Sequence, residues 1–261
     1  MSRLYPLLNE AIRSGEPAAL ATLIEGGPVG SKLLVRSGAD PEGDLGHPGL
    51  NRVVARAARA ELEQGLTGIR HYGPEGQARQ DEVAVFIEAF APPPRMLIFG
   101  AVDFTAALVR VAKVLGYHVS VCDARRVFAT RNRFPSADEV LNEWPDELLA
   151  RVGPTLGPRD AVCVLTHDHK FDVPAVTGAL ATRVGYLGCM GSRRTHAKRV
   201  ELLRSEGVTE ADLGRVMAPI GLDIGSRTPE ETAVAICAEI IALRTGRKAP
   251  SLRDGDGPIH D

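Results

Sequence analysis

The chain has 261 residues, enough for one large domain or a small domain followed by a medium one. Its formal net charge is -2, with 44% hydrophobic and 25% charged residues, as in an ordinary globular protein. This balance argues against nucleic acid or an anionic membrane as the main partner. The sequence has no apolar run long enough to span a membrane and no apolar signal stretch at its start, so we expect a cytoplasmic protein.

The cysteines lie far apart and form no CxxC pair: Cys122, Cys163, Cys189 and Cys237. This spacing argues against both a zinc site and a disulfide framework. We expect reduced thiols that serve mainly as small apolar side chains.

Residues 1–90 predict a small α/β domain. Apolar residues at helical spacing predict one helix from Leu4 to about Gly15 and another from Leu50 to about Gly65. Short apolar runs predict strands over 18–24, 32–35, 69–72 and 83–90, and composition predicts a loop over 39–44.

The run Pro92 to Pro94 cannot continue a helix or a sheet ladder, so we place a domain boundary there. Beyond it, short apolar runs predict strands over 96–99, 119–122, 161–166 and 184–187, and helical stripes predict helices over 104–115, 173–182, from about 192, and over 228–244. Apolar strands that alternate with helices indicate a parallel sheet covered on both faces. We therefore predict a Rossmann-like domain over 95–246, followed by a loosely ordered tail over 247–261.

The first candidate site is the turn after the strand that begins this domain, with Gly100, Ala101, Val102 and Asp103. A dinucleotide fold places its glycine-rich phosphate loop here, and Asp123 ends the next strand where a ribose-binding carboxylate would lie. Val102 stands where a second glycine would let pyrophosphate approach, and Asp103 puts a negative charge beside any phosphate. The turn thus predicts either a phosphate site or a Rossmann fold that no longer binds a dinucleotide in the usual way.

The second candidate follows the third strand of this domain. Ligands of open α/β sheets bind outside the carboxyl ends of the strands, so Thr166, His167 and Asp168 should face the cleft. His167 could move a proton, and with Asp168 and His169 it could in principle bind a metal. A metal is disfavoured because these ligands are bunched, and Asp168 or Asp172 could instead cap the next helix.

The third candidate begins the next helix, at Gly191 and Ser192. Arg193 and Arg194 lie in its first turn, where a positive charge opposes the macrodipole at a cost of roughly 0.3–1 kcal/mol each. An anion at this helix start would explain them, because guanidinium and free backbone N–H groups could share it. A solvated basic face is the alternative.

The fourth candidate is the loop with Pro219, Gly221, Asp223 and Gly225. Its two glycines suggest backbone packed close to a ligand, with Asp223 directed inward. A tight structural turn is the competing interpretation.

These four blocks, in this order and at these intervals, resemble the xanthine dehydrogenase accessory protein family (XdhC/CoxI). The resemblance runs from about Pro94 to Arg244 and includes the stretches MLIFGAVDF, VCDAR, RFPSADEV, VLTHDHKFDVP, GCMGSRRTHAKR and PIGLDIGSRTPEETAVAI. It implies a small N-terminal domain joined to a Rossmann domain, and a tendency to form dimers. It also implies binding of the molybdopterin cofactor, protection of its sulfurated form and delivery to a molybdenum hydroxylase of xanthine dehydrogenase or carbon monoxide dehydrogenase type.

Carried over position by position, the resemblance implies a cofactor site made of four groups of residues. These are Gly100, Asp123 and Arg125; Thr166, His167 and Asp168; Gly191, Ser192 and Arg193; and Pro219, Gly221, Asp223 and Gly225. In this reading Asp123 and Asp223 accept hydrogen bonds from sugar or pterin groups.

The sequence departs from the family pattern in two places. The glycine-rich turn is altered at Val102 and Asp103. Residues 1–90 lack both the glycine–cysteine block SGGCVE and the RSAPRPPGA-like block, and they contain no cysteine. Cys189, in the loop before Gly191, is then the cysteine expected to be exposed in the cleft, as a plain loop residue or with a role in sulfur handling.

We therefore expect a non-catalytic accessory protein that binds molybdopterin or its dinucleotide form. The phosphate would bind at the helix starts after Gly100 and Gly191, where Arg193 and Arg194 neutralise its charge. The expected partner is the apoenzyme of a molybdenum hydroxylase. An NAD(P)-dependent oxidoreductase with His167 as the proton-transfer residue stays open as an alternative, as does a scaffold that docks on an enzyme without binding a ligand.

Overall fold

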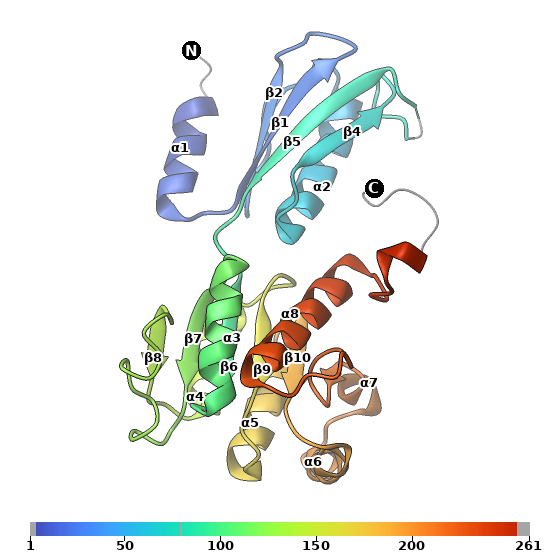
Figure 1. The fold of residues 1–261 in the computed structure, drawn as a ribbon. Helices are drawn as coiled ribbons and strands as arrows, with labels where there is room; N and C mark the ends of the chain where they lie inside the picture. The colour runs from blue at the N-terminus through green and yellow to red at the C-terminus, as the bar shows by residue number, and fades with distance from the viewer. Residues whose placement is uncertain (1–3, 79, 255–261) are drawn as a thin grey trace. The chain divides into compact units, whose positions relative to one another are not determined.

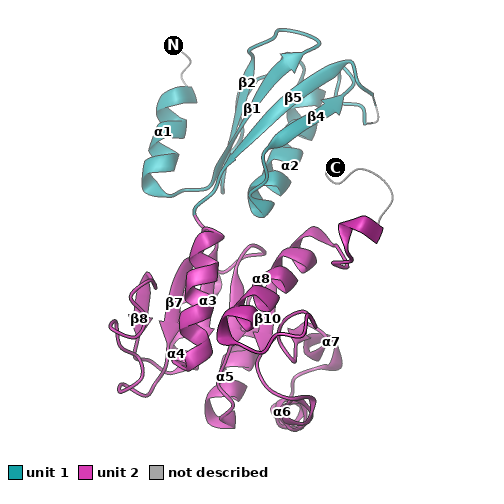
Figure 2. Ribbon diagram, viewed as in Figure 1, with its two compact units in different colours: residues 1–92 teal, residues 93–261 magenta. Residues whose placement is uncertain are grey.

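The computed structural model describes residues 4–78 and 80–254, and the chain divides into two compact units, 1–92 and 93–261 (Figures 1 and 2). The division falls inside the run of prolines that the sequence marks as a boundary. Of the expected tail, residues 252–254 form a 3₁₀ turn and residues 255–261 lie outside the described residues. Within the described ranges, no helix combines the length and apolarity needed to cross a membrane.

The first unit is an antiparallel sheet with strand order β3-β2-β1-β5-β4. Its strands are β1 (Ala18–Glu25), β2 (Lys32–Arg36), β3 (Glu42–Asp44), β4 (Gly68–Tyr72) and β5 (Val83–Phe90). Side chains of the central strand β1 alternate between the two faces: Ala19 and Leu23 pack with helix α2 (Pro48–Gln64), whereas Ala18 packs with helix α1 (Leu4–Ser14). The loop expected over 39–44 is partly wrong, because β3 pairs with β2 there as a short edge strand.

The second unit is a parallel sheet with strand order β11-β10-β9-β6-β7-β8, which confirms the predicted Rossmann-like architecture. Its strands are β6 (Arg95–Phe99), β7 (His118–Cys122), β8 (Glu139–Leu141), β9 (Ala161–Val164), β10 (Tyr186–Cys189) and β11 (Val216–Met217). Its helices are α3 (Asp103–Val114), α4 (Pro145–Val152), α5 (His169–Leu180), α6 (Arg193–Ser205), α7 (Glu210–Leu213) and α8 (Pro229–Thr245), with a 3₁₀ turn over Gly153–Thr155.

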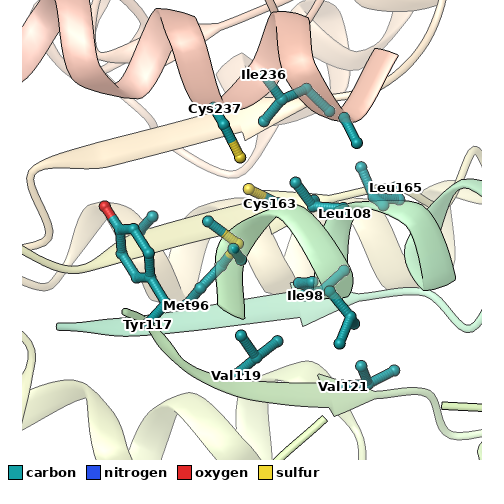
Figure 3. Close-up of a cluster of buried hydrophobic side chains, with 14 of the residues drawn as sticks. Met96, Ile98, Leu108, Tyr117, Val119, Val121, Cys163, Leu165, Ile236 and Cys237 are labelled. Carbon is teal, nitrogen blue, oxygen red and sulfur yellow. The ribbon is translucent and has the colours of Figure 1, made fainter. Parts of the chain in front are cut away.

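Helices cover both faces of this parallel sheet, as its apolar strands require. On one face α3 and α8 pack on Ile98, Val121 and Cys163, as Figure 3 shows. On the other face α4 and α5 pack on Phe99 and Val164. Alternate residues of each strand thus belong to two separate cores, one on each face of the sheet.

The sequence placed the long elements well and the short ones poorly. The last helix begins with the capping box of Thr228 and Glu231, and its Ile240 is buried whereas Ile241 is 38% exposed. The strand expected over 184–187 is found at Tyr186–Cys189, because its pairing with β9 begins at Tyr186 and extends to Cys189. The sequence did not predict β8, α4, α7 and β11, which have two to eight residues each and too few positions for a periodic pattern.

We predict that Gly100→Ala lowers the free energy of unfolding of the second unit by about 3 kcal/mol. Gly100 has φ +112°, and a Cβ there would lie 2.6 Å from Thr166 Cγ2 and 3.0 Å from Thr166 N. Gly116 has φ +80° with open space around it, so Gly116→Ala isolates the backbone cost, about 1–2 kcal/mol. Urea denaturation checks the difference, and equal losses for the two variants would contradict the close contact with Thr166.

Candidate functional site

A pocket of about 380 Å³ lies at the carboxyl ends of the central strands. Strand β6 has β7 on one side and β9 on the other, so the strand order reverses here, where open α/β sheets bind ligands. The lining comes from the segments after β6, β7, β9 and β10, and consists of Ala101, Val102, Asp103, Phe104, Arg125, Phe128, Arg133, Leu165, His167 and Met190. The structure therefore brings residues of the first two candidate blocks and Arg125 to one place, beside Met190, which precedes the third block.

The buried carboxylate of Asp123 holds the turn after β6. Its Oδ2 accepts from the Ala101 N–H at 2.8 Å and from Arg125 Nη2 at 2.7 Å, and its Oδ1 accepts from Arg125 Nε at 2.9 Å. Burial by itself would raise the pKa of Asp123, but the hydrogen bonds from Arg125 and Ala101 outweigh it and lower that pKa below its usual value. Asp123 ties the turn to the next loop, a role different from the expected acceptor for a sugar.

One wall of the pocket consists of Arg125, Phe128 and Arg133, which we call the arginine wall. The guanidinium carbons of Arg125 and Arg133 lie 4.7 and 5.7 Å from the centre of the Phe128 ring, within the range of cation–π contacts. Arg133 Nη1 donates to the Ala101 carbonyl at 2.9 Å, and its Nη2 lies 3.6 Å from Asp103 Oδ1. Both guanidinium groups are thus positioned by contacts within the chain.

Sequence reasoning missed half of the lining: Phe104, Phe128, Arg133, Leu165 and Met190. Arg133 stands in the stretch RFPSADEV, which carried the resemblance without being assigned a role. Motif spacing marks strand ends, whereas Phe128 and Arg133 reach the pocket through the shape of the loop after β7.

The turn after β9 is fixed by a buried ion pair. Thr166 donates its hydroxyl to Asp172, and Arg199 Nη2 lies 2.7 Å from Asp172 Oδ2 and donates to the Met190 carbonyl at 2.9 Å. The side chains of Asp172 and Arg199 have no exposed surface, so this pair joins α5 to α6 inside the unit. Asp168 caps α5 by accepting from the Lys170 N–H, as the capping alternative predicted.

The third block begins α6 as expected, but its arginines lie outside the pocket lining. Ser192 is the N-cap, and its hydroxyl accepts from the Thr195 N–H at 3.1 Å. Arg193 and Arg194 are exposed and do not line the pocket, although the preceding Met190 does. Their predicted role in neutralising phosphate is not tested by this geometry and stays a prediction.

The fourth block packs against α8 as a tight turn. Gly221 has φ +94° and donates its N–H to Glu239 at 3.0 Å, and a Cβ there would lie 3.2 Å from the backbone N of Ile236. Pro219 and Asp223 do not line the pocket. Because Asp223 is exposed, the expectation that it points inward is wrong. The packing of the turn agrees with the structural interpretation, and a role of this loop in ligand binding stays a prediction.

All four cysteines are free and buried, which confirms the prediction of apolar thiols. The expectation that Cys189 is exposed in the cleft is wrong, because it ends β10 with no exposed surface. Burial raises the pKa of the Cys189 thiol to about 12 and that of Cys237 to about 11. Thiols this basic stay protonated at neutral pH and are poor nucleophiles, so Cys189 is unsuited to handling sulfur.

Metal-ligand side chains are not grouped in the described part of the chain. Among residues 4–78 and 80–254, no three His, Cys, Asp or Glu side chains lie where they could hold one ion.

The fold defines a class: proteins with a Rossmann domain, a pocket at its switch point, and a preceding unit built on an antiparallel sheet. Comparison with protein families narrows the class. The XdhC Rossmann domain matches residues 96–240, and the XdhC and CoxI family matches residues 11–73. The first match alone covers more than half of the chain, which therefore belongs to the XdhC and CoxI family.

The chain is also similar to two named proteins. The chain is 32% identical over 160 residues to a protein of Bacillus subtilis named as a probable xanthine dehydrogenase subunit, covering 61% of this chain and 46% of the relative. It is 25% identical over 166 residues to the molybdenum cofactor insertion chaperone PaoD of Escherichia coli, covering 64% of this chain and 45% of that protein. The chain spans less than half the length of these relatives.

A crystal structure described as a xanthine dehydrogenase from Bacillus halodurans has a similar fold. It aligns with 94% of this chain and 97% of its own chain, at 20% identity and a TM-score of 0.53. At this identity the similarity supports the fold alone.

We predict that Arg199→Met destabilises the second unit by about 3–5 kcal/mol, because it leaves the Asp172 carboxylate buried without its partner. Arg204→Met is the matched control, since Arg204 pairs with Glu210 at the surface and such pairs contribute about 0–1 kcal/mol. Urea denaturation of both variants gives the comparison. Similar losses for the two would show that the buried pair does not hold the corner after β9.

We also predict that almost no thiol of the folded protein reacts with Ellman's reagent at pH 8. Burial keeps all four thiols protonated and covered, whereas denaturant should release all four for rapid reaction. A single rapidly reacting thiol in the folded protein, mapped to Cys189 by mass spectrometry, would restore a chemical role for that residue.

Proposed function

We propose that this chain is a cytoplasmic protein that binds molybdenum cofactor and assists its insertion into a molybdenum hydroxylase of xanthine dehydrogenase or carbon monoxide dehydrogenase type. The observation that carries the proposal is the pocket at the switch point of the XdhC Rossmann domain, with two arginines in its lining. The names of two relatives support this proposal. The Bacillus subtilis protein is named as a probable xanthine dehydrogenase subunit, and PaoD of Escherichia coli as a molybdenum cofactor insertion chaperone. The partner in this proposal is the apoenzyme that receives the cofactor.

The residues of the pocket fit a phosphorylated pterin. Such a molecule has a planar heterocycle and an anionic phosphate ester, and ligand sites combine an apolar lining with a few polar groups. Phe104, Leu165 and Met190 supply the apolar surface, and Arg125 and Arg133 supply N–H donors for the anion. The bound cofactor supplies the molybdenum centre to the client enzyme, while this chain binds it, orients it and shields it from water.

The helix start at α6 has a secondary place in this proposal. Met190, which lines the pocket, is followed directly by Gly191, Ser192, Arg193 and Arg194. The positive charge of the two arginines and of the helix N-terminus favours an anionic ligand at this edge of the sheet. His167, exposed at the pocket, can donate to or accept from the ligand.

The pairing of Asp123 argues against the competing function, an NAD(P)-dependent oxidoreductase. A dinucleotide site of the usual kind uses the carboxylate after the second strand to hold a ribose. Here that carboxylate already accepts from Arg125 and from the Ala101 N–H. Releasing it for a sugar would leave Arg125 without its partner, so we favour the pterin cofactor.

We predict that Val102→Trp reduces cofactor retention about tenfold or more, because a large ring at this half-buried position fills the pocket. Val127→Trp is the matched control, since Val127 is 81% exposed and does not line the pocket. Retention is measured by pterin fluorescence after oxidation of protein purified with its cofactor. Equal retention in both variants, or tight NADH binding by the wild type with no pterin, would overturn the proposal.

A further inference from the structure

We infer that the arginine wall is the subsite for the phosphate group of the bound ligand, and that Asp103 is a carboxylate which this phosphate must displace. The inference relies on the proposed function for the identity of the ligand as a pterin. The chemistry of the subsite, a phosphate ester held by two guanidinium groups, follows from contacts within this chain.

Two backbone donors of the turn after β6, the N–H groups of Ala101 and Val102, already have partners within the chain. The Ala101 N–H donates to Asp123 at 2.8 Å, and the Val102 N–H faces the Thr105 hydroxyl at 3.3 Å. That buried hydroxyl in turn donates to the Gly100 carbonyl at 2.5 Å. Backbone N–H groups with partners inside the chain gain little from a ligand, so side-chain donors at the pocket contribute most to phosphate recognition in this inference.

The guanidinium group of Arg125 is held in position to donate hydrogen bonds to a ligand. Its guanidinium carbon lies 4.7 Å from the Phe128 ring centre and 5.6 Å from that of Phe171, so aromatic rings hold it alongside the two bonds to Asp123. A guanidinium carries five N–H donors, and these bonds need only two of them. The side chain is still 40% exposed and lines the pocket, so further donors can serve a ligand without reorganisation.

Arg133 supplies the second guanidinium, and Asp103 competes for it. Arg133 Nη1 is held by the carbonyls of Ala101 and Phe128, at 2.9 and 3.3 Å, whereas Nη2 faces Asp103 at 3.6 Å. The Asp103 side chain is 92% exposed, so this ion pair is long, solvated and weak. A phosphate carries more charge and more acceptor oxygens than a carboxylate, and it can take the place of Asp103 through shorter, charge-assisted hydrogen bonds.

The competing carboxylate explains an otherwise unfavourable feature of the turn after β6. Asp103 begins α3, where a negative charge favours the helix but repels a phosphate. A protein that delivers its ligand must also release it, and a carboxylate that refills the subsite lowers the affinity for phosphate. Asp103 therefore limits how tightly the ligand is retained, whereas Arg125 and Arg133 recognise its phosphate group.

The test measures binding of 6-hydroxymethylpterin, its monophosphate and cytidine monophosphate to the full chain by titration calorimetry. We expect the pterin phosphate to bind about tenfold more tightly than the unphosphorylated pterin. Arg133→Gln should remove this advantage and Arg133→Lys should restore part of it. Asp103→Asn should strengthen phosphate binding about threefold. Arg126→Gln, at an exposed neighbour outside the pocket lining, should change nothing.

The outcomes separate this inference from the proposed function. If both pterins bind equally, or if Asp103→Asn weakens phosphate binding, the inference fails while the pterin site stands. If only cytidine monophosphate binds, with the expected effects at Arg133 and Asp103, the subsite stands and the pterin proposal fails. If wild-type chain binds none of the three compounds, both are overturned. Because Asp103 is almost fully exposed, its variant keeps the test valid should Arg133→Gln fail to fold.

Discussion

The pocket depends on one buried carboxylate, that of Asp123. By accepting from the Ala101 N–H and from Arg125, it joins the turn after β6 to the loop after β7, and these two segments supply most of the pocket lining. A buried carboxylate is costly unless it is fully hydrogen-bonded, so this junction has one favourable arrangement rather than several. The positions of Arg125, and through it of Phe128, follow from that arrangement.

A second buried group supports the other side of the pocket in the same manner. The Asp172–Arg199 pair connects α5 to α6 and reaches the Met190 carbonyl, while Thr166 donates to the same aspartate. Leu165 and His167, on either side of Thr166, are thereby placed at the pocket. The charged groups buried here hold segments of the unit together, whereas Arg125 and Arg133 keep part of their surface exposed at the pocket.

Much of the fold could be predicted because its strands carry a strong signal. Four consecutive apolar residues at 96–99 and an apolar run at 119–122 suit strands buried on both faces, and both strands are found there. The site was harder to predict. Spacing located Asp123 at a strand end, but it could not tell whether a ligand or Arg125, two residues further on, would take the carboxylate.

Other parts of the site were hard to predict for the same reason. Arg193 and Arg194 begin a helix, and a helix start does not determine which side chains enter a pocket. Phe128 and Arg133 belong to a loop without periodic pattern, and their positions depend on contacts with Ala101 and Arg125 that only the folded chain reveals. The ends of strands can be predicted from the sequence, whereas the loop residues that line a pocket can be identified only from the tertiary structure.

The stacking at the arginine wall continues beyond the pocket to the single tryptophan of the chain. Arg125 lies over Phe171, and the Phe171 ring centre is 5.1 Å from that of Trp144. Because the Trp144 ring contacts Phe171 and is 43% exposed, its emission depends on that contact and on its access to solvent. The chain thus contains an intrinsic optical reporter, two contacts away from the guanidinium group at the pocket, that requires no added label.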